Sequence, residues 1–280
     1  MQPATDPSTF EPWPDHPILD GVFGATANPL RQIFMIGAMW RLAQESRAGK
    51  VQVLEVGSWC GASALTWGEA IQLHFAGEGK ITCVDAWQPY VDLQTNVGIV
   101  DHDMDAALLR GEPFEMFRHN IGFLAAGIDV EIRNGWSNDV LPLLEPGAYD
   151  LVYIDADHTY AGVRTDIENS AGLVREGGII CGDDLELQAG ECGLSILDEQ
   201  PSVDKCYDEA RDTVFHPGIT KAVGEAFGRV SSWAGFWAMQ KTPDGWATVS
   251  LRGMTPHIPS NIPAQSLMGL KALLMQEGLF

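Results

Sequence analysis

Positive charge is scarce in this sequence. Its 280 residues include 17 lysines and arginines against 38 aspartates and glutamates, which gives a formal net charge of −21 at pH 7. A field of this sign repels phosphate polymers and anionic membrane surfaces, so we expect neither nucleic acid nor a membrane as a partner. A small-molecule substrate fits the charge better.

Paired cysteines and long apolar runs are also missing. The five cysteines, at positions 60, 83, 181, 192 and 206, form no CxxC pair, which favours reduced thiols over a disulfide or zinc framework. No stretch approaches the roughly 18 apolar residues of a membrane span. The N-terminus is rich in proline and acidic residues and does not resemble a signal peptide. We therefore expect a cytoplasmic protein.

What the sequence does contain is an alternation of apolar strands and helices. We expect strands at 51–57, 80–87, 130–135, 149–157 and 176–184, and a terminal hairpin within 235–251. Helices are expected from Asn28 as cap and Pro29 as first helical residue, and then at 62–75, 113–126, 138–145 and from 160. This order predicts an α/β fold, doubly wound and Rossmann-like, with a mostly parallel seven-stranded sheet that ends in an antiparallel hairpin.

The predicted domain spans 28–252, between an irregular arm at 1–27 and a C-terminal tail at 253–280. The tail includes an amphipathic stretch, "AQSLMGLKALLMQ", which we expect to serve packing or contact between subunits, since we expect a homo-oligomer. Residues 88–112 are a long mixed segment that is the natural place for a substrate cover. Phe10, Trp13 and Phe23 of the arm could form a lid.

A glycine turn between strand and helix, "LEVGSWCGASALTW" at 54–67, predicts a ligand site. Ligands of open α/β sheets bind at the carboxyl ends of the strands. A dinucleotide would require G-x-G-x-x-G, but Trp59 stands where the second glycine belongs, and the spacing from Gly57 to Gly61 suits a ligand without a pyrophosphate. Asp85, at the end of the next strand, is placed to bind ribose hydroxyls. Alternatively, the glycines only form a tight turn and Asp85 caps a helix.

The order of motifs resembles a known family. "LEVGSWCGASALTW", "VDAW", "GWSNDVLPLL", "YDLVYIDADHTY" and "GGIICGDD" follow one another as in class I S-adenosylmethionine-dependent methyltransferases. The chain is most similar to the metal-dependent O-methyltransferases, of the catechol type and of the bacterial macrolide-sugar group. The resemblance covers about 50–250 and implies S-adenosyl-L-methionine as the cofactor.

The resemblance also implies a cofactor pocket. Around the methionine part of the cofactor it places Glu55, Gly57, Trp59, Gly61 and Ser63. The cofactor's carboxylate would be held by Ser63 and by N–H groups at the helix start. Asp85 would bind the ribose, Ser137 and Asn138 would border the adenine, and Trp136 would lie near the adenine face.

Three carboxylates, Asp155, Asp183 and Asp184, follow neighbouring strands and should share one cleft. They would repel one another without a cation, and oxygen ligands favour Mg²⁺, Mn²⁺ or Ca²⁺. The family pattern agrees, with Asp155 bordering both the metal and the cofactor. Alternatively, Asp183 and Asp184 are solvated loop carboxylates. A chelated metal would acidify an acceptor hydroxyl and fix its position.

Two histidines are candidates for the base. His158 lies three residues after Asp155, where the catechol enzymes carry a lysine described as the base, and His216 lies in a segment whose family counterpart borders the substrate. A neutral imidazole can accept the hydroxyl proton near pH 7, although His158 could also be a hydrogen-bonded loop residue.

The resulting prediction is methyl transfer to a hydroxyl of a small polyhydroxylated substrate, sugar-like or a natural-product precursor. The alternatives are a metal-independent methyltransferase acting on nitrogen or a carboxylate, a noncatalytic cofactor-binding protein, and a nicotinamide-dependent oxidoreductase. Trp59 and the terminal hairpin disfavour the last of these.

Overall fold

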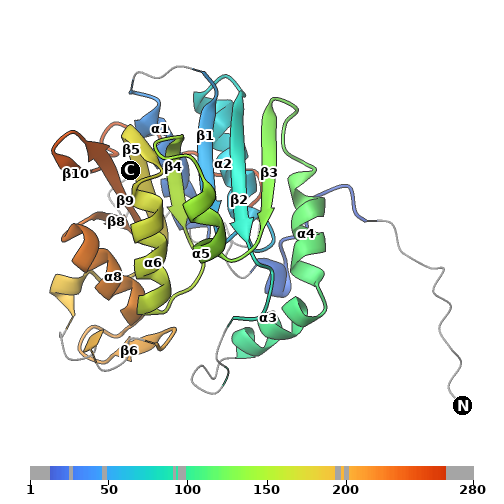
Figure 1. Ribbon diagram of the computed structural model, residues 1–280. Coiled ribbons are helices and arrows are strands. Elements are labelled where there is room, and N and C mark those ends of the chain that lie inside the picture. Colours follow the sequence, from blue (N-terminus) through green and yellow to red (C-terminus); the bar gives the residue numbers. More distant parts are fainter. Residues whose placement is uncertain are drawn as a thin grey trace, which may run out of the picture.

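The computed structural model describes residues 13–24, 28–45, 49–90, 93, 99–192, 197–198 and 202–262. Within these ranges, eight strands form one sheet in the order β10-β9-β5-β4-β1-β2-β3, with β8 paired to β9 (Figure 1). The strands are β1 (Val51–Val56), β2 (Gly79–Asp85), β3 (Ile128–Asn134), β4 (Tyr149–Ile154), β5 (Val174–Leu185), β8 (Ser231–Trp233), β9 (Gly235–Thr242) and β10 (Gly245–Thr248). The strands from β5 to β3 pair in parallel, and β9 joins β5 antiparallel.

Helices cover both faces of this sheet. The described helices include α1 (Pro29–Leu42), α2 (Ala62–His74), α3 (Ile99–Leu109), α4 (Glu112–Ile121), α5 (Ser137–Val140), α6 (Tyr160–Ala171) and α8 (Pro217–Phe227), of which α3 lies beyond the carboxyl edge of the sheet rather than on a face. Alternate residues of a strand point to opposite faces. Val53 accordingly belongs to the core cluster of α1 and α2, whereas Leu54 belongs to that of α6 and α8. The predicted doubly wound α/β fold with its terminal hairpin is confirmed, with β8 as an additional short strand.

Several boundaries differ from the prediction. The helix expected at 113–126 is α4, which ends at Ile121 because the turn at Gly122 closes it. The strand expected at 149–157 ends at Ile154, and Val174 lies in β5 rather than on the face of α6. The mixed segment 88–112 contains α3, and the sequence prediction lacked α8 and the small hairpin of β6 (Cys206–Asp208) and β7 (Thr213–Phe215).

The arm packs along α4 where it is described. Trp13 stacks on His119 with ring centroids 4.9 Å apart, and the backbone of Ile18 exchanges two hydrogen bonds with the Asn120 side chain. Phe10 and the amphipathic stretch after 262 lie outside the described residues. Among the helices that are described, none has the length and apolar character needed to cross a membrane.

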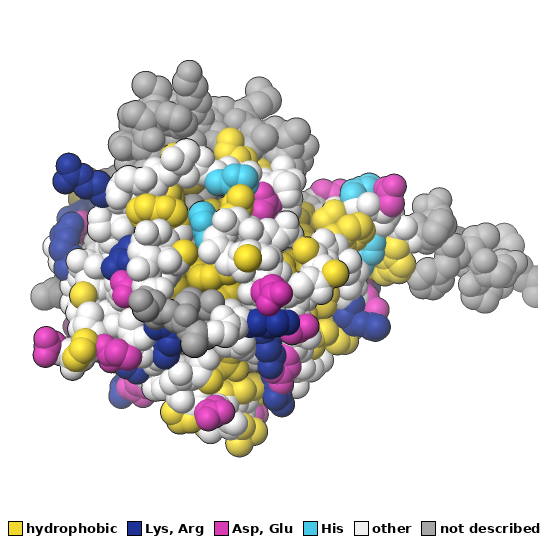
Figure 2. All heavy atoms as spheres, turned by 90° about the horizontal axis from the view of Figure 1, so that it is seen from above, with side chains coloured by type: hydrophobic (Ala, Val, Ile, Leu, Met, Phe, Trp, Pro, Cys, Tyr) yellow, Lys and Arg dark blue, Asp and Glu magenta, His cyan; other side chains and the backbone are white. Residues whose placement is uncertain are grey.

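The carboxyl ends of the parallel strands all point to the same edge, the lower one in Figure 1, where α3 and β6 lie. The opposite edge is seen in Figure 2, where basic and acidic side chains are mixed on the visible face. The turns after β1, β2 and β4 and the end of β5 therefore converge at the lower edge, and this is where the candidate site lies.

Candidate active site

A cavity of about 450 Å³ lies at the carboxyl ends of the strands. Twelve of the fourteen residues selected from the sequence line it: Gly57, Trp59, Ser63, Asp85, Trp136, Ser137, Asn138, Asp155, His158, Asp183, Asp184 and His216. Tyr90, Met104 and Leu108, from the segment expected to cover the substrate, line it too. The volume is within the range typical of small-molecule sites.

Glu55 and Gly61 do not line this cavity. Glu55 lies on the same side of β1 as Val53, so the alternation of the strand turns its side chain into the core beneath α2, where it is fully buried. Burial raises its pKa to about 7, and the side chains of Ser63 and Ser58 oppose that rise. Gly61 caps α2 with φ +86°, and the position of its absent Cβ faces Phe117 of α4.

The glycine turn is fixed by close approach of two strand ends. Gly57 has φ +88°, and a Cβ there would lie 2.0 Å from the carbonyl oxygen of Asp155, so only glycine fits. The Asp85 carboxylate accepts hydrogen bonds from the backbone N–H groups of Ser58 (2.9 Å), Trp59 (2.9 Å) and Trp87 (2.6 Å). Burial raises the pKa of Asp85, and these three bonds oppose the rise. Asp85 thus holds the turn and faces the cavity.

At the cavity's other end, an irregularity in β5 gathers acidic side chains. The register of β5 against β9 shifts between Gly182 and Leu185, and Asp184 adopts φ +60°. Consecutive strand residues normally point to opposite faces, but this bulge lets Asp183 and Asp184 both reach the same partner. That partner is Arg31, a residue that the sequence analysis did not select.

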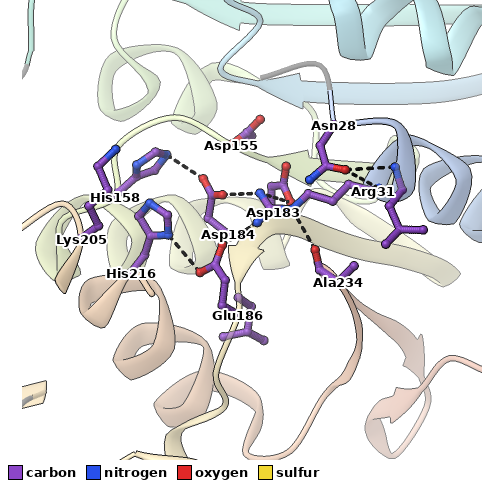
Figure 3. A network of polar contacts seen from close by, with 12 residues as sticks. Asn28, Arg31, Asp155, His158, Asp183, Asp184, Glu186, Lys205, His216 and Ala234 are labelled. Atoms are coloured by element: carbon purple, nitrogen blue, oxygen red, sulfur yellow. Dashed lines mark hydrogen bonds and ion pairs between the residues drawn. The ribbon is translucent and has the colours of Figure 1, made fainter. Parts of the chain in front are cut away.

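Arg31 of α1 inserts its guanidinium among the carboxylates (Figure 3). Its Nη1 lies 3.0 Å from Asp183 Oδ1 and also pairs with Asp184, its Nη2 pairs with Glu186, and its Nε donates to the carbonyl of Ala234 at 2.9 Å. Burial lowers the pKa of Arg31, but the three carboxylates together raise it by more than burial lowers it, so the side chain stays charged.

His158 is held between two carboxylates. Its Nδ1 lies 2.6 Å from Asp204 Oδ1, and its Nε2 lies 3.3 Å from Asp184 Oδ2. Burial lowers the pKa of His158, but the hydrogen bond to Asp204 and the charges of Asp184, Asp204 and Asp155 raise it to about 10. His216 lies edge-on to His158 at 4.9 Å between ring centroids, with its Nδ1 3.0 Å from Glu186.

The carboxylates are perturbed in different directions. Burial and the neighbouring Asp184 raise the pKa of Asp155 to about 6. Burial also raises the pKa of Asp183, against the attraction of Arg31. Asp184 has a lowered pKa because His158, His216 and Arg31 outweigh its burial. Groups with such perturbed ionisation in one cleft are typical of functional sites.

The expected metal ligands are only partly brought together. Ligand atoms of Asp155, His158 and Asp184 all lie within 4.8 Å of one another. Asp183 belongs to no such group within the described ranges, and its Oδ1 accepts no hydrogen bond there although it is buried. The 3.0 Å ion pair with Arg31 is therefore electrostatic rather than a well-aligned hydrogen bond.

At the cavity end near Trp136, α6 contributes a residue the sequence analysis missed. Asp166 is 1 % exposed and lines the cavity, and its Oδ1 has no hydrogen-bond partner among the described residues. Burial raises its pKa to about 6, which Ser137 opposes. No sequence signal distinguished Asp166, Asp204, Glu186 or Arg31, because each acts through residues distant in the chain.

Comparison with known proteins shows which family part of the chain resembles. Residues 54–185 match a family model described as a methyltransferase domain, which spans the stretch from the glycine turn to Asp184. This match confirms the resemblance to class I S-adenosylmethionine-dependent methyltransferases. No curated protein matches the chain at a significant level.

Solved structures resemble the chain at low sequence identity, and NovP shares its fold. The O-methyltransferase NovP is 18 % identical over 76 % of this chain and 80 % of its own, with a TM-score of 0.50. An O-methyltransferase from Bacillus cereus in complex with SAH is 16 % identical over 82 % and 80 %, with a TM-score of 0.40. CalS11, a TDP-rhamnose 3'-O-methyltransferase of calicheamicin biosynthesis, is 13 % identical over 74 % and 78 %, also at 0.40.

Proposed function

Starting from the methyltransferase domain at 54–185, we propose that this protein transfers a methyl group from S-adenosylmethionine to a hydroxyl of a small, polyhydroxylated acceptor. One observation carries the proposal: a single cavity joins the glycine turn and Asp85 at one end to Asp155, Asp184 and His158 at the other. A donor bound against the turn would therefore present its methyl group to an acceptor held beside the carboxylates and the histidine. NovP, whose fold is shared, is itself an O-methyltransferase.

The cofactor would occupy the end built by the turns after β1, β2 and β3. Gly57 lines this end of the cavity, and Ser63 with the N–H groups at the start of α2 would hold the carboxylate of the cofactor. Asp85 would bind the ribose, since its two oxygens have about four acceptor sites and three are used by the backbone. Ser137, Asn138 and Trp136 would border the adenine.

The donor set fits a divalent cation in part. Asp155 and Asp184 supply hard oxygen ligands beside His158, and the buried Oδ1 of Asp183 has no hydrogen-bond donor among the described residues. Such a set favours Mg²⁺ or Mn²⁺, and a bound cation would acidify the acceptor hydroxyl. Against this, Arg31 already neutralises part of the charge of Asp183 and Asp184.

The proton of the hydroxyl would go to His158. Its Nδ1 faces Asp204, so the carboxylate fixes the ring and leaves Nε2 facing Asp184 and the cavity. Because the surrounding carboxylates raise its pKa to about 10, His158 can accept a proton at neutral pH only when their charge is offset. His216, at 4.9 Å from His158 between ring centroids, is the alternative acceptor.

The test is a transfer assay with S-adenosylmethionine labelled in the methyl group and a panel of sugars, polyols and catechols. We expect labelled product that survives mild alkali, since methyl ethers resist saponification, and that mass spectrometry identifies as an O-methyl ether. Label released as methanol by alkali would instead show a carboxylate acceptor, and an N-methyl product a nitrogen acceptor. No transfer to any compound, with S-adenosylhomocysteine still bound, would favour a noncatalytic cofactor-binding protein.

A further inference from the structure

Arg31 lies where the proposed function requires positive charge. It reaches Asp183, Asp184 and Glu186 from α1, a helix whose backbone is anchored by fully buried side chains such as Ile33 and Phe34. A displacement of the Arg31 side chain alone would therefore leave this core intact. Its own exposed fraction is 14 %, and it lines the cavity at the carboxyl ends of the strands, so the guanidinium has open space on that side.

The turn between β8 and β9 is shaped around this guanidinium. Ala234 adopts φ +52°, a conformation that non-glycine residues rarely accept, and its carbonyl receives the Nε–H of Arg31 at 2.9 Å. Gly235 follows at φ +94°, and a Cβ there would lie 2.5 Å from Arg31 Nη2. The turn at Ala234 and Gly235 thus forms a fitted position for the Arg31 guanidinium, which we call the seat. The absence of a side chain at Gly235 makes room for it.

The seat leaves one carboxylate oxygen, Oδ1 of Asp183, without a hydrogen bond among the described residues. Asp183 is 7 % exposed, yet its Oδ1 accepts no hydrogen bond among the described residues and faces Arg31 at 3.0 Å. A buried carboxylate oxygen without a donor is costly unless another cation can approach it. Side-chain atoms of Asp155, His158 and Asp184 lie within 4.8 Å of one another, and Asp184 directly follows Asp183 in the chain.

We propose that Arg31 and a divalent cation are alternative counterions of Asp183 and Asp184. With the guanidinium seated, Asp183 is withheld from the cation, and Asp155 and Asp184 alone form an incomplete site. With the guanidinium displaced into the cavity, both carboxylates become ligands. Arg31 therefore weakens cation binding in the resting protein. This inference rests on the proposed function, because it takes the cation from there.

The test measures Mn²⁺ affinity directly, from the electron paramagnetic resonance signal of free Mn²⁺, in the presence of saturating S-adenosylhomocysteine. Arg31→Met keeps the length of the side chain and removes its charge, so Mn²⁺ should bind at least tenfold more tightly than to the wild type, since a positive charge a few ångströms from the cation is lost. Arg41→Met is the matched control. Arg41 lies on the same helix but pairs with Glu45 and Gln240 instead, so Mn²⁺ affinity should stay within twofold.

Arg31→Lys is a second variant that tests the inference if Arg31→Met does not fold. Lysine keeps the charge but cannot reach all of the partners of the guanidinium fork, so its Mn²⁺ affinity should lie between those of the wild type and Arg31→Met. In the wild type, the Nε–H resonance of Arg31 should shift when Mg²⁺ is added, because the bond to Ala234 breaks.

Equal Mn²⁺ affinity in the wild type, Arg31→Met and Arg31→Lys overturns the inference and leaves the proposed methyl transfer standing. Absence of Mn²⁺ binding in every variant overturns it as well. If instead no variant binds S-adenosylhomocysteine, the proposed function itself fails.

Discussion

Replacing Gly57 by alanine tests how the structure builds the turn of the proposed cofactor site. The added Cβ would lie 2.0 Å from the carbonyl oxygen of Asp155, at φ +88°. Two costs add. The left-handed conformation costs a residue with a Cβ about 1–2 kcal/mol, and forcing the ends of β1 and β4 apart costs about 1–3 kcal/mol. Alanine regains about 0.4–1 kcal/mol by restricting the unfolded chain. The net loss should be about 1–5 kcal/mol, from these three contributions together.

Two other glycines separate these contributions. Gly77 has φ +75° with nothing within 4 Å of a Cβ, so Gly77→Ala carries only the conformational cost and the gain from the unfolded chain, a net loss of about 0–1.6 kcal/mol. Gly172 has φ −73° and the same open space, so Gly172→Ala should be neutral or stabilising by up to about 1 kcal/mol.

The assay is urea unfolding followed by circular dichroism, for the wild type and the three alanine variants. The expected order of stability is Gly172→Ala, Gly77→Ala and Gly57→Ala, from highest to lowest. The Gly57→Ala variant should also lose affinity for S-adenosylhomocysteine, because its turn lines the cavity. A Gly57→Ala variant as stable as Gly77→Ala would refute the close approach of the turn to Asp155.

Further predictions concern the metal, the base and pH. Chelation with EDTA should abolish turnover and Mg²⁺ or Mn²⁺ should restore it, and Asp183→Ala should impair the metal-supported rate while calorimetry shows S-adenosylhomocysteine binding largely intact; full activity in excess chelator would contradict this. His158→Ala should lower kcat by about 10²–10⁴-fold, partly recovered at high pH where hydroxide replaces the base, and a near-normal rate would refute the role of His158. Glu69 accepts hydrogen bonds from His257 (2.6 Å) and from the N–H (2.7 Å) and hydroxyl (2.6 Å) of Ser260; although burial raises its pKa, these partners lower it overall. Because the pKa of Glu69 is lower in the folded than in the unfolded protein, its ionised carboxylate stabilises the fold above the unfolded pKa. This stability is lost as pH falls through the folded pKa. Glu69→Gln should therefore cost about 1–3 kcal/mol in urea unfolding at pH 7. The difference should vanish in acid, and an equal cost at pH 3 would contradict the sign.

Much of the fold follows from local patterns. Val53 and Leu54 illustrate why: both are buried, on opposite faces of β1, and only a sheet covered on both sides buries neighbouring apolar residues of one strand. Asn28 accepts from the N–H groups of Leu30 and Arg31 as the capping pattern predicted. The segment around α8 escaped prediction because it contains Gly218 and Gly224, which weaken a helical signal, and its burial depends on packing against α6 and β5.

The candidate site was predictable where residues follow strand ends and hidden where the partners are remote. Gly57, Asp85 and Asp155 stand at the ends of apolar strands, which is a local signal. Arg31 pairs with carboxylates about 150 positions away along the chain, and nothing in an apolar helix marks one arginine as their partner. Asp204 lies in an acidic, aperiodic stretch, so its contact with His158 could only come from the folded chain. Glu55 was placed in the cofactor wall by resemblance, whereas strand alternation turns it into the core.

The central claim, that this cavity binds S-adenosylmethionine through the glycine turn and Asp85, is tested most directly by calorimetric titration of the protein with S-adenosylhomocysteine. We expect one site of micromolar affinity in the wild type and at least tenfold weaker binding in Asp85→Asn. The matched control is Asp129→Asn, because Asp129 starts β3 at the opposite edge and pairs with Lys50, and its affinity should be unchanged. Tight binding of NADH without any response to S-adenosylhomocysteine would contradict the account.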